Sequence, residues 1–172
     1  MAIKGLGRIV GAHVMFAGLG KDFLDLVAGC AKNVRFAAGE YLYREGNESN
    51  EIYLVREGHV ALELGAPGLG RMTFLTAGPN SVVGLSWLVP PYRWTYDARA
   101  QDDVWAISID AICLRDKCDV DPALGYEVMK RFMPSIMDRL RSTSLQMLDV
   151  FGCLWYPRLT ARPTRWSRCW RG

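Results

Sequence analysis

The segment from residue 34 to residue 77 constrains the fold most, because short apolar runs with a period of two alternate there with glycine-containing turns. The runs are Val34–Phe36, Tyr41–Tyr43, Ile52–Val55, Val60–Leu64 and Met72–Leu75. Alternation with a period of two is typical of strands that bury one face. Short strands with turn signals every 8 to 12 residues favour a sandwich or a jelly-roll barrel. The glycines at 39, 46 and 58 suit turn positions with positive φ.

Helical patterns flank this β-rich segment on both sides. Residues 1–33 place Phe23, Leu24 and Val27 at helical spacing. After a last strand at Val104–Ile109, Asp110 is a helix N-cap for residues 111–117, and Asp121 followed by Pro122 starts a long helix to about residue 150. We therefore predict an α+β fold: a β jelly roll (double-stranded β-helix) with N-terminal helices and a short plus a long C-terminal helix.

The long helix carries a broad apolar stripe from Leu124 to Leu140, with steps of three and four residues. The stripe is wider than one side of a small barrel needs, so residues 121–150 could also pair with a second copy in a homodimer. Packing on its own barrel only is the alternative.

The helix and strand patterns, with a basic C-terminus, divide the chain into four predicted parts. These are an N-terminal helical segment (1–33), the jelly-roll core (34–109), the C-terminal helices (110–151) and a basic tail (152–172). Residues 153–172 hold five arginines and no acidic residue, so residues 1–152 keep 16 basic against 18 acidic side chains, a net charge of −2. The tail is interpreted as disordered, as a nucleic-acid-binding segment in which tryptophans stack and arginines meet phosphates, or as a reading-frame accident.

Composition argues against several classes of protein. No apolar run reaches the length of a membrane span, and the N-terminus lacks the pattern of a secretory signal. The five cysteines are odd in number and form no CxxC pair, which favours reduced, buried thiols in a cytoplasmic protein. With only two histidines, His13 and His59, no zinc site is expected. We find no nucleophile–base pair and no Walker loop, so no enzymatic activity is predicted.

The segment from Gly78 to Ala100 is the candidate binding site. It reads as a short strand, Gly84, a helical segment stopped by Pro90 and Pro91, and a strand-like stretch from Trp94. A strand, a glycine and one helical turn can direct backbone N–H groups toward an anion. An ordinary corner between two strands is the alternative, because short loops of this kind are weak motifs.

Three glycine-anchored motifs occur in the order and spacing of a known family. They are Phe36-Ala37-Ala38-Gly39, Glu45-Gly46-Asn47 and Tyr53-Leu54-Val55-Arg56-Glu57-Gly58 followed by Val60. Over about residues 15–150 the chain resembles the cyclic-nucleotide-binding domain of the catabolite activator/FNR superfamily, with Asn47 in place of the usual Asp. The resemblance implies a jelly roll that binds cAMP or cGMP, without a metal, and a long helix that dimerises.

The candidate site departs from the family's cassette, in which a Glu after the glycine holds the ribose and an Arg before Ser/Thr pairs with the phosphate. Here Leu85 stands in the place of the Glu, and Trp94 in the place of the Arg. Arg93 is one position early, so it should point to the opposite face of the strand unless a bulge corrects it. The predicted ligand-binding residues are Val83, Gly84, Leu85, Ser86, Arg93, Thr95 and Arg99.

Two functions remain open at this point. The first is a sensor that binds a cyclic nucleotide or a related small anion and signals through the long helix. The second is a non-binding dimerisation or interaction module, which Trp87 and Trp94 filling the cavity would favour. A truncated transcription regulator is a further alternative, because the last twenty residues leave no room for a helix-turn-helix, so sequence-specific DNA binding is not expected.

Overall fold

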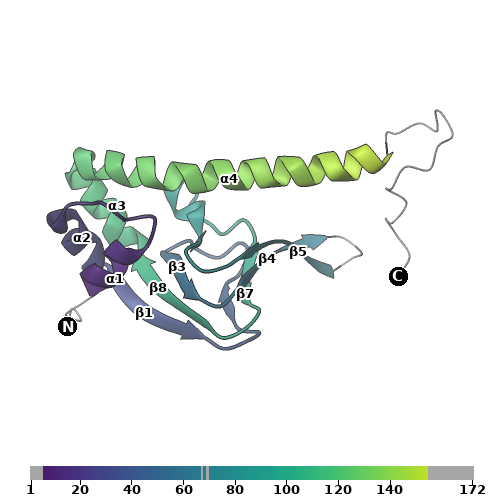
Figure 1. The fold of residues 1–172 in the computed structure, drawn as a ribbon, viewed down its shortest axis with the longest axis horizontal. Helices are drawn as coiled ribbons and strands as arrows, with labels where there is room; N and C mark the ends of the chain where they lie inside the picture. Colours follow the sequence, from purple (N-terminus) through teal and green to yellow (C-terminus); the bar gives the residue numbers. More distant parts are fainter. Residues whose placement is uncertain (1–5, 67, 69, 155–172) are drawn as a thin grey trace. The chain divides into compact units, whose positions relative to one another are not determined.

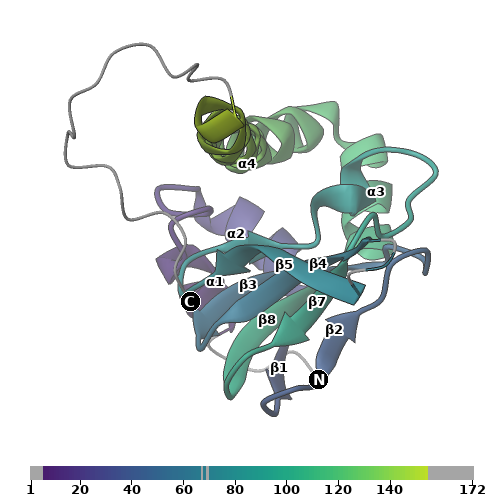
Figure 2. The ribbon, with the colours of Figure 1, turned by 90° about the vertical axis from the view of Figure 1, so that its right-hand side faces the viewer.

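The computed structural model describes residues 6–66, 68 and 70–154, and it contains two four-stranded antiparallel sheets (Figures 1 and 2). One sheet has the order β1–β8–β3–β6 and the other the order β2–β7–β4–β5. The strands are β1 (Ala31–Phe36), β2 (Tyr41–Tyr43), β3 (Glu51–Glu57), β4 (Val60–Ala66), β5 (Gly70–Ala77), β6 (Val82–Val83), β7 (Asp97–Ala100) and β8 (Val104–Asp110). This is the jelly roll that the sequence predicts.

The sheet β1–β8–β3–β6 separates two hydrophobic cores. In β3 the side chains of Ile52 and Leu54 belong to a core shared with the helices, whereas Tyr53 and Val55 face the interior of the roll. All four are buried, so the period of two expected for this strand is wrong: the strand buries both faces and is a continuous apolar run. We call the two cores the helical core and the roll interior.

The helices are α1 (Leu6–Ala12), α2 (Lys21–Ala28), α3 (Ala111–Val120) and α4 (Pro122–Leu154), with a 3-10 helix η1 at Leu85–Leu88. Both predicted N-caps are confirmed. Asp110 Oδ1 accepts the Cys113 N–H at 2.9 Å, and Asp121 Oδ1 accepts the N–H groups of residues 123 and 124 at 3.0 and 3.2 Å. Several predicted bounds differ from the structure: β1 begins at residue 31, β7 begins at residue 97 rather than 94, α3 reaches residue 120, and β3, β4 and β5 are longer than predicted.

The chain forms two compact units, residues 1–135 and 136–172, and α4 contributes to both. In the first unit α4 buries Leu124, Val128 and Phe132 in the helical core. The Phe132 ring meets Phe16 and Trp87 edge-on, with ring centroids 6.2 and 5.4 Å apart. In the second unit Ile136 is half-buried, and the apolar residues of α4 from 137 to 148 are exposed; they are Met137, Leu140, Leu145, Met147 and Leu148. Most of the basic tail, from residue 155 onward, lies outside the described residues.

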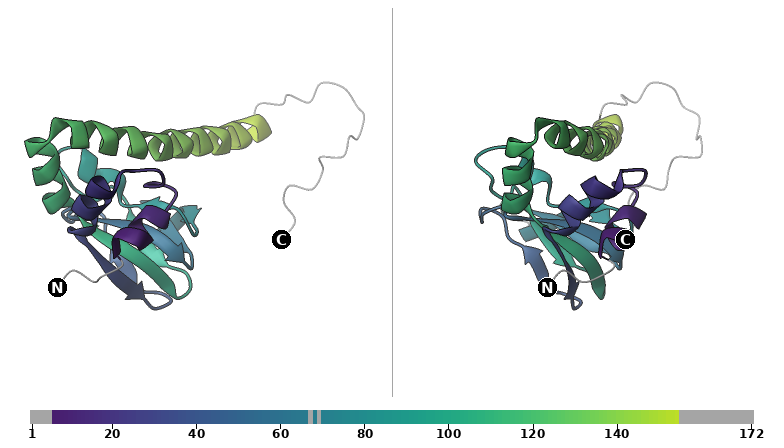
Figure 3. Two further views of the ribbon diagram at one scale, coloured as in Figure 1. Left: turned by 60° about the vertical axis from the view of Figure 1, so that its left-hand side comes forward. Right: turned by 90° about the vertical axis from the view of Figure 1, so that its left-hand side faces the viewer.

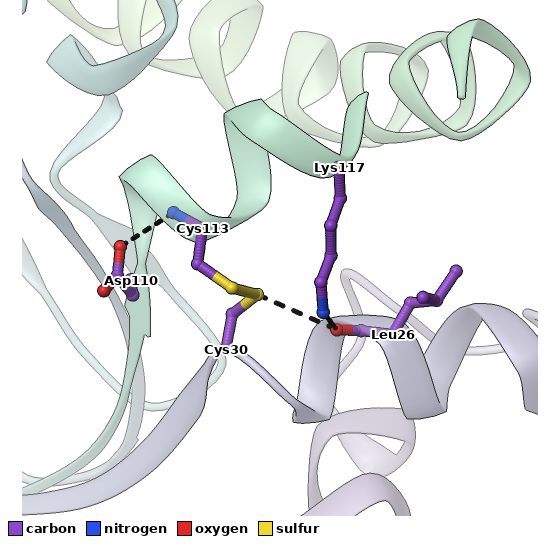
Figure 4. The surroundings of a disulfide bond; sticks show 5 residues. All are labelled: Leu26, Cys30, Asp110, Cys113 and Lys117. Atoms are coloured by element: carbon purple, nitrogen blue, oxygen red, sulfur yellow. Dashed lines mark hydrogen bonds between the residues drawn. A yellow bond between two sulfur atoms is a disulfide. The ribbon is translucent and has the colours of Figure 1, made fainter. Parts of the chain in front are cut away.

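A disulfide joins Cys30, just after α2, to Cys113 in α3, with Cα atoms 5.8 Å apart (Figure 4). The sequence-based expectation of reduced thiols is therefore wrong for this pair. Strand pairing explains the error, because β1 pairs with β8 in the register Ala31–Ile109 and so brings two cysteines 83 residues apart to one end of the sheet. Nearby, Lys117 Nζ donates to the Leu26 carbonyl at 2.7 Å. Cys118 is a free thiol.

Replacing both Cys30 and Cys113 by alanine is expected to lower the free energy of unfolding by about 2–4 kcal/mol, because the bond closes a long loop in the unfolded chain. Urea unfolding with and without a reductant measures the effect, and Cys118→Ala serves as the matched control. An unchanged midpoint in reductant, with both thiols shown to be free by mass spectrometry, would contradict this expectation.

No helix among the described residues is long and apolar enough to cross a bilayer.

Candidate ligand-binding site

Gly84 ends β6 and opens η1 in a left-handed conformation, with φ 92° and ψ 50°. A Cβ atom at this position would lie 2.9 Å from the ring of Trp94 and 3.2 Å from the Glu51 carbonyl oxygen. Both the backbone angle and the close approach of the ring therefore require glycine here. The preceding residue, Val83, is buried in the roll interior and pairs with Tyr53 of β3.

Trp94 lies in the roll interior, where only 5% of its surface is exposed. Its ring is stacked on Tyr43, with centroids 3.8 Å apart and planes inclined by 12°. Its backbone is held by the Glu45-Gly46-Asn47 turn, since the Trp94 N–H donates to the Asn47 carbonyl at 2.9 Å and the Gly46 N–H donates to the Trp94 carbonyl at 2.8 Å. Backbone hydrogen bonds and ring stacking thus both hold Trp94 in place.

The two residues beside Trp94 are exposed, as the period of an extended chain requires. Arg93 donates from Nη1 to the Gly46 carbonyl at 2.7 Å, and Thr95 is exposed. No bulge returns Arg93 to the interior; its backbone forms an isolated antiparallel β-bridge with the backbone of Glu48. The expectation that Arg93 points away from the face of Trp94 agrees with this geometry.

Arg99 lies on the outer face of its sheet, because Ala98 and Ala100 on either side of it belong to the roll interior. Its Nε and Nη2 atoms lie 3.0 and 2.6 Å from one oxygen of Glu63, a carboxylate that is only 3% exposed. The hydrogen bonds that Arg99 donates to Glu63, followed by the charge of Glu63, raise the pKa of Arg99 further above its ordinary value. The guanidinium is therefore already committed to a carboxylate of its own chain.

The same outer face holds a second ion-pair group that sequence reasoning missed. Asp97 is fully buried, accepts the Glu45 N–H at 2.7 Å and pairs with Arg44 and Arg71. Its neighbours come from two segments far from it in sequence, so only the strand order could have revealed the group. Buried carboxylates of this kind must be paired, because an isolated buried charge is costly.

The remaining predicted site residues belong to the other side of the sheet. Leu85 packs against the helical core, and Ser86 is half-buried beside it. Trp87 is buried in the helical core, so it does not fill the roll interior as Trp94 does. Arg115 of α3 donates to the Trp87 carbonyl at 3.1 Å and lies over the Tyr92 ring. Sequence reasoning missed this contact. The seven predicted residues therefore do not converge on one cavity.

Comparison with known proteins places this geometry in a family. Residues 33–121 match the cyclic nucleotide-binding domain. The chain belongs to this family. It is 25% identical over 146 residues to the CRP-like cAMP-activated global transcriptional regulator of Mycobacterium tuberculosis, a match that covers 84% of this chain and 63% of the relative. The chain thus spans less than two thirds of the length of that regulator.

Solved structures of cyclic nucleotide-binding proteins share the fold. A candidate cyclic nucleotide-binding protein from Geobacter metallireducens superposes with a TM-score of 0.71 at 25% identity, over 78% of this chain and 97% of that one. The catabolite activator protein of Thermus thermophilus gives a TM-score of 0.63 at 22% identity, over 80% of this chain and 62% of its own. The second likeness supports the fold alone.

The two positions expected to depart from the family cassette both hold apolar side chains that pack within the protein. Trp94, expected in the place of an arginine, is buried against Gly84. Leu85, expected in the place of a glutamate, packs with the helical core.

Proposed function

We propose that this cyclic nucleotide-binding domain is a regulatory interaction module whose inherited nucleotide pocket is filled by its own Trp94. The observation that carries the proposal is the stacking of Trp94 on Tyr43 in the roll interior, 3.8 Å between centroids, with its ring against Gly84. Of the two functions that the sequence left open, this favours the non-binding module.

The arginines support the same conclusion. A cyclic phosphate in this pocket would need a cation, but Arg93 is exposed and bound to the Gly46 carbonyl, and Arg99 is paired with Glu63 on the outer face. Each charged hydrogen bond that is lost costs about 1.5–3 kcal/mol. Because Leu85 and Trp94 stand where a glutamate and an arginine are expected, cAMP or cGMP would lose two such contacts. Either nucleotide would also have to displace a buried tryptophan.

A sensor remains the second candidate function, and the match of residues 33–121 to the family favours it. In that case a cyclic nucleotide or related small anion would select a minor conformation in which Trp94 leaves the roll interior. In either case we assign signalling to α4 and a homodimer to residues 121–150, because the apolar stripe there is only partly buried within its own unit. A cytoplasmic location stays a prediction.

Isothermal titration with cAMP and then cGMP tests the proposal. The wild-type chain is expected to give no saturable heat into the millimolar range. The double variant Leu85→Glu/Trp94→Arg, which restores both family contacts, is expected to gain binding. Trp94→Ala is the matched control, because it opens the space without supplying a cation.

Saturable heat from the wild-type chain would overturn the filled-pocket proposal and make the sensor the primary function. Sedimentation velocity on the same samples tests the assembly, and a monomer throughout would refute the homodimer assignment.

A further inference from the structure

A cavity of about 340 Å³ lies between α1 and the helix-facing side of the sheet β1–β8–β3–β6. Its apolar wall comes from Ile9 and Ala12 of the N-terminal helix and Ile107 of β8. Figure 3 shows α1 lying beside this sheet. Ile107 belongs to the helical core, so the cavity is on the opposite side of the sheet from Trp94 and the roll interior. Its volume falls within the range of small-molecule sites.

Two arginines from different elements line this cavity, Arg8 of α1 and Arg56 of β3. Four other arginines of the described chain, Arg35, Arg44, Arg71 and Arg99, each pair with an aspartate or glutamate. Within the same described residues, neither Arg8 nor Arg56 has a carboxylate partner, and the hydrogen bond of Arg56 goes to the neutral Asn33 amide at 3.3 Å. The cavity wall therefore holds two uncompensated positive charges.

His13 adds a buried donor to the same wall. It is 5% exposed, and its Nδ1 accepts the Met15 N–H at 3.2 Å, so the ring proton of the neutral imidazole is on Nε2. Nε2 has no hydrogen-bond partner of ordinary length and angle. Burial lowers the pKa of His13, and a hydrogen-bond interaction with the Ser81 backbone raises it to a lesser extent. A buried donor without a well-formed hydrogen bond normally signals a missing partner.

We propose that this cavity binds a small organic anion of the aliphatic monocarboxylate class. The carboxylate would accept from the guanidinium groups of Arg8 and Arg56 and from His13 Nε2, because a guanidinium fork matches a planar carboxylate. The aliphatic body would contact Ile9, Ala12 and Ile107. The proposal does not depend on the nucleotide pocket, which lies on the other side of the sheet.

Titration of the full chain with octanoate tests the proposal. Binding is measured by calorimetry and by the NMR chemical shifts of the methyl groups of Ile9 and Ile107. Two further probes separate the contributions of the carboxylate and of the alkyl chain. 1-Octanol has the same alkyl chain without the charge, and inorganic phosphate has charge without an alkyl chain. We expect saturable octanoate binding that shifts both isoleucines, with octanol about tenfold or more weaker and phosphate not saturating. Absence of saturable octanoate binding, or equal affinity for octanol, would overturn the proposal.

Variants locate the site. Arg8→Gln combined with Arg56→Gln is expected to weaken octanoate binding by about tenfold to a hundredfold, because two charged hydrogen bonds are lost. His13→Phe removes the third donor and should weaken it less. Arg35→Gln, on the same sheet but outside the cavity, is the matched control and should change nothing. Octanoate affinity that survives the double arginine variant would place the ligand elsewhere and refute the assignment.

Discussion

Replacement of Trp94 by alanine is expected to lower the free energy of unfolding by about 3–5 kcal/mol, the usual cost of truncating a buried aromatic residue. The ring is 5% exposed and is stacked on Tyr43, so the variant loses both buried apolar surface and an aromatic pair. The neighbouring backbone cannot close over the space, because the Gly46 and Asn47 hydrogen bonds hold it in place. Urea unfolding followed by far-ultraviolet circular dichroism measures the loss.

Trp105→Ala is the matched control for this prediction. Trp105 lies on β8 in the same domain but is 44% exposed, with Arg35 over its ring. Its removal should cost less than about 1 kcal/mol. Equal losses at the two tryptophans would show that Trp94 does not support the roll interior, and the filled-pocket proposal would lose its main observation.

Replacement of Phe132 by alanine is expected to cost a similar amount, about 3–5 kcal/mol. Phe132 is fully buried and meets Phe16 and Trp87 edge-on, so it joins α4 to the N-terminal segment and to the η1 loop. The loss should be largest where α4 docks. Amide hydrogen exchange should therefore speed up in residues 122–132 before it does in the strands of the roll.

Tyr126→Ala on the same helix is the control, because Tyr126 is 66% exposed and its ring is approached by Lys130. It should change stability and exchange little. Equally slow amide exchange in residues 122–132 of the Phe132→Ala and Tyr126→Ala variants would contradict this prediction. It would show that the helical core does not hold this part of α4 in place.

The jelly roll was predictable because its turns depend on local backbone chemistry. Gly39, Gly46 and Gly58 have φ values of 87°, 83° and 83°, the conformation that the turn signals called for. At Gly58 a Cβ atom would also lie 2.4 Å from the Asp103 carbonyl oxygen, so both the backbone angle and the lack of space require glycine there. The helix starts were predictable for the same reason, since Asp110 and Asp121 cap N–H groups two or three residues away.

The site was less predictable, because its features join residues that are far apart in sequence. The family resemblance led us to expect Trp94 in the place of an arginine, but not the stacking on Tyr43, 51 residues earlier, that holds the ring in place. The alternation of side chains along β7 could have placed Arg99 on the outer face. Its contact with Glu63, however, depends on the pairing of β4 with β7. The Cys30–Cys113 bond likewise depends on the pairing of β1 with β8.

The loop between Gly84 and Trp94 places one tryptophan in each of the two cores. Trp87 is buried against Phe132 of α4 in the helical core, and Trp94 is buried against Tyr43 in the roll interior. A short segment thus connects the contents of the roll to the docking of α4. If this loop couples the two burials, thermodynamic linkage makes the coupling reciprocal: a change that favours Trp94 burial through the loop would favour helix docking by the same free energy, and a partner that pulls on α4 would weaken the burial of Trp94.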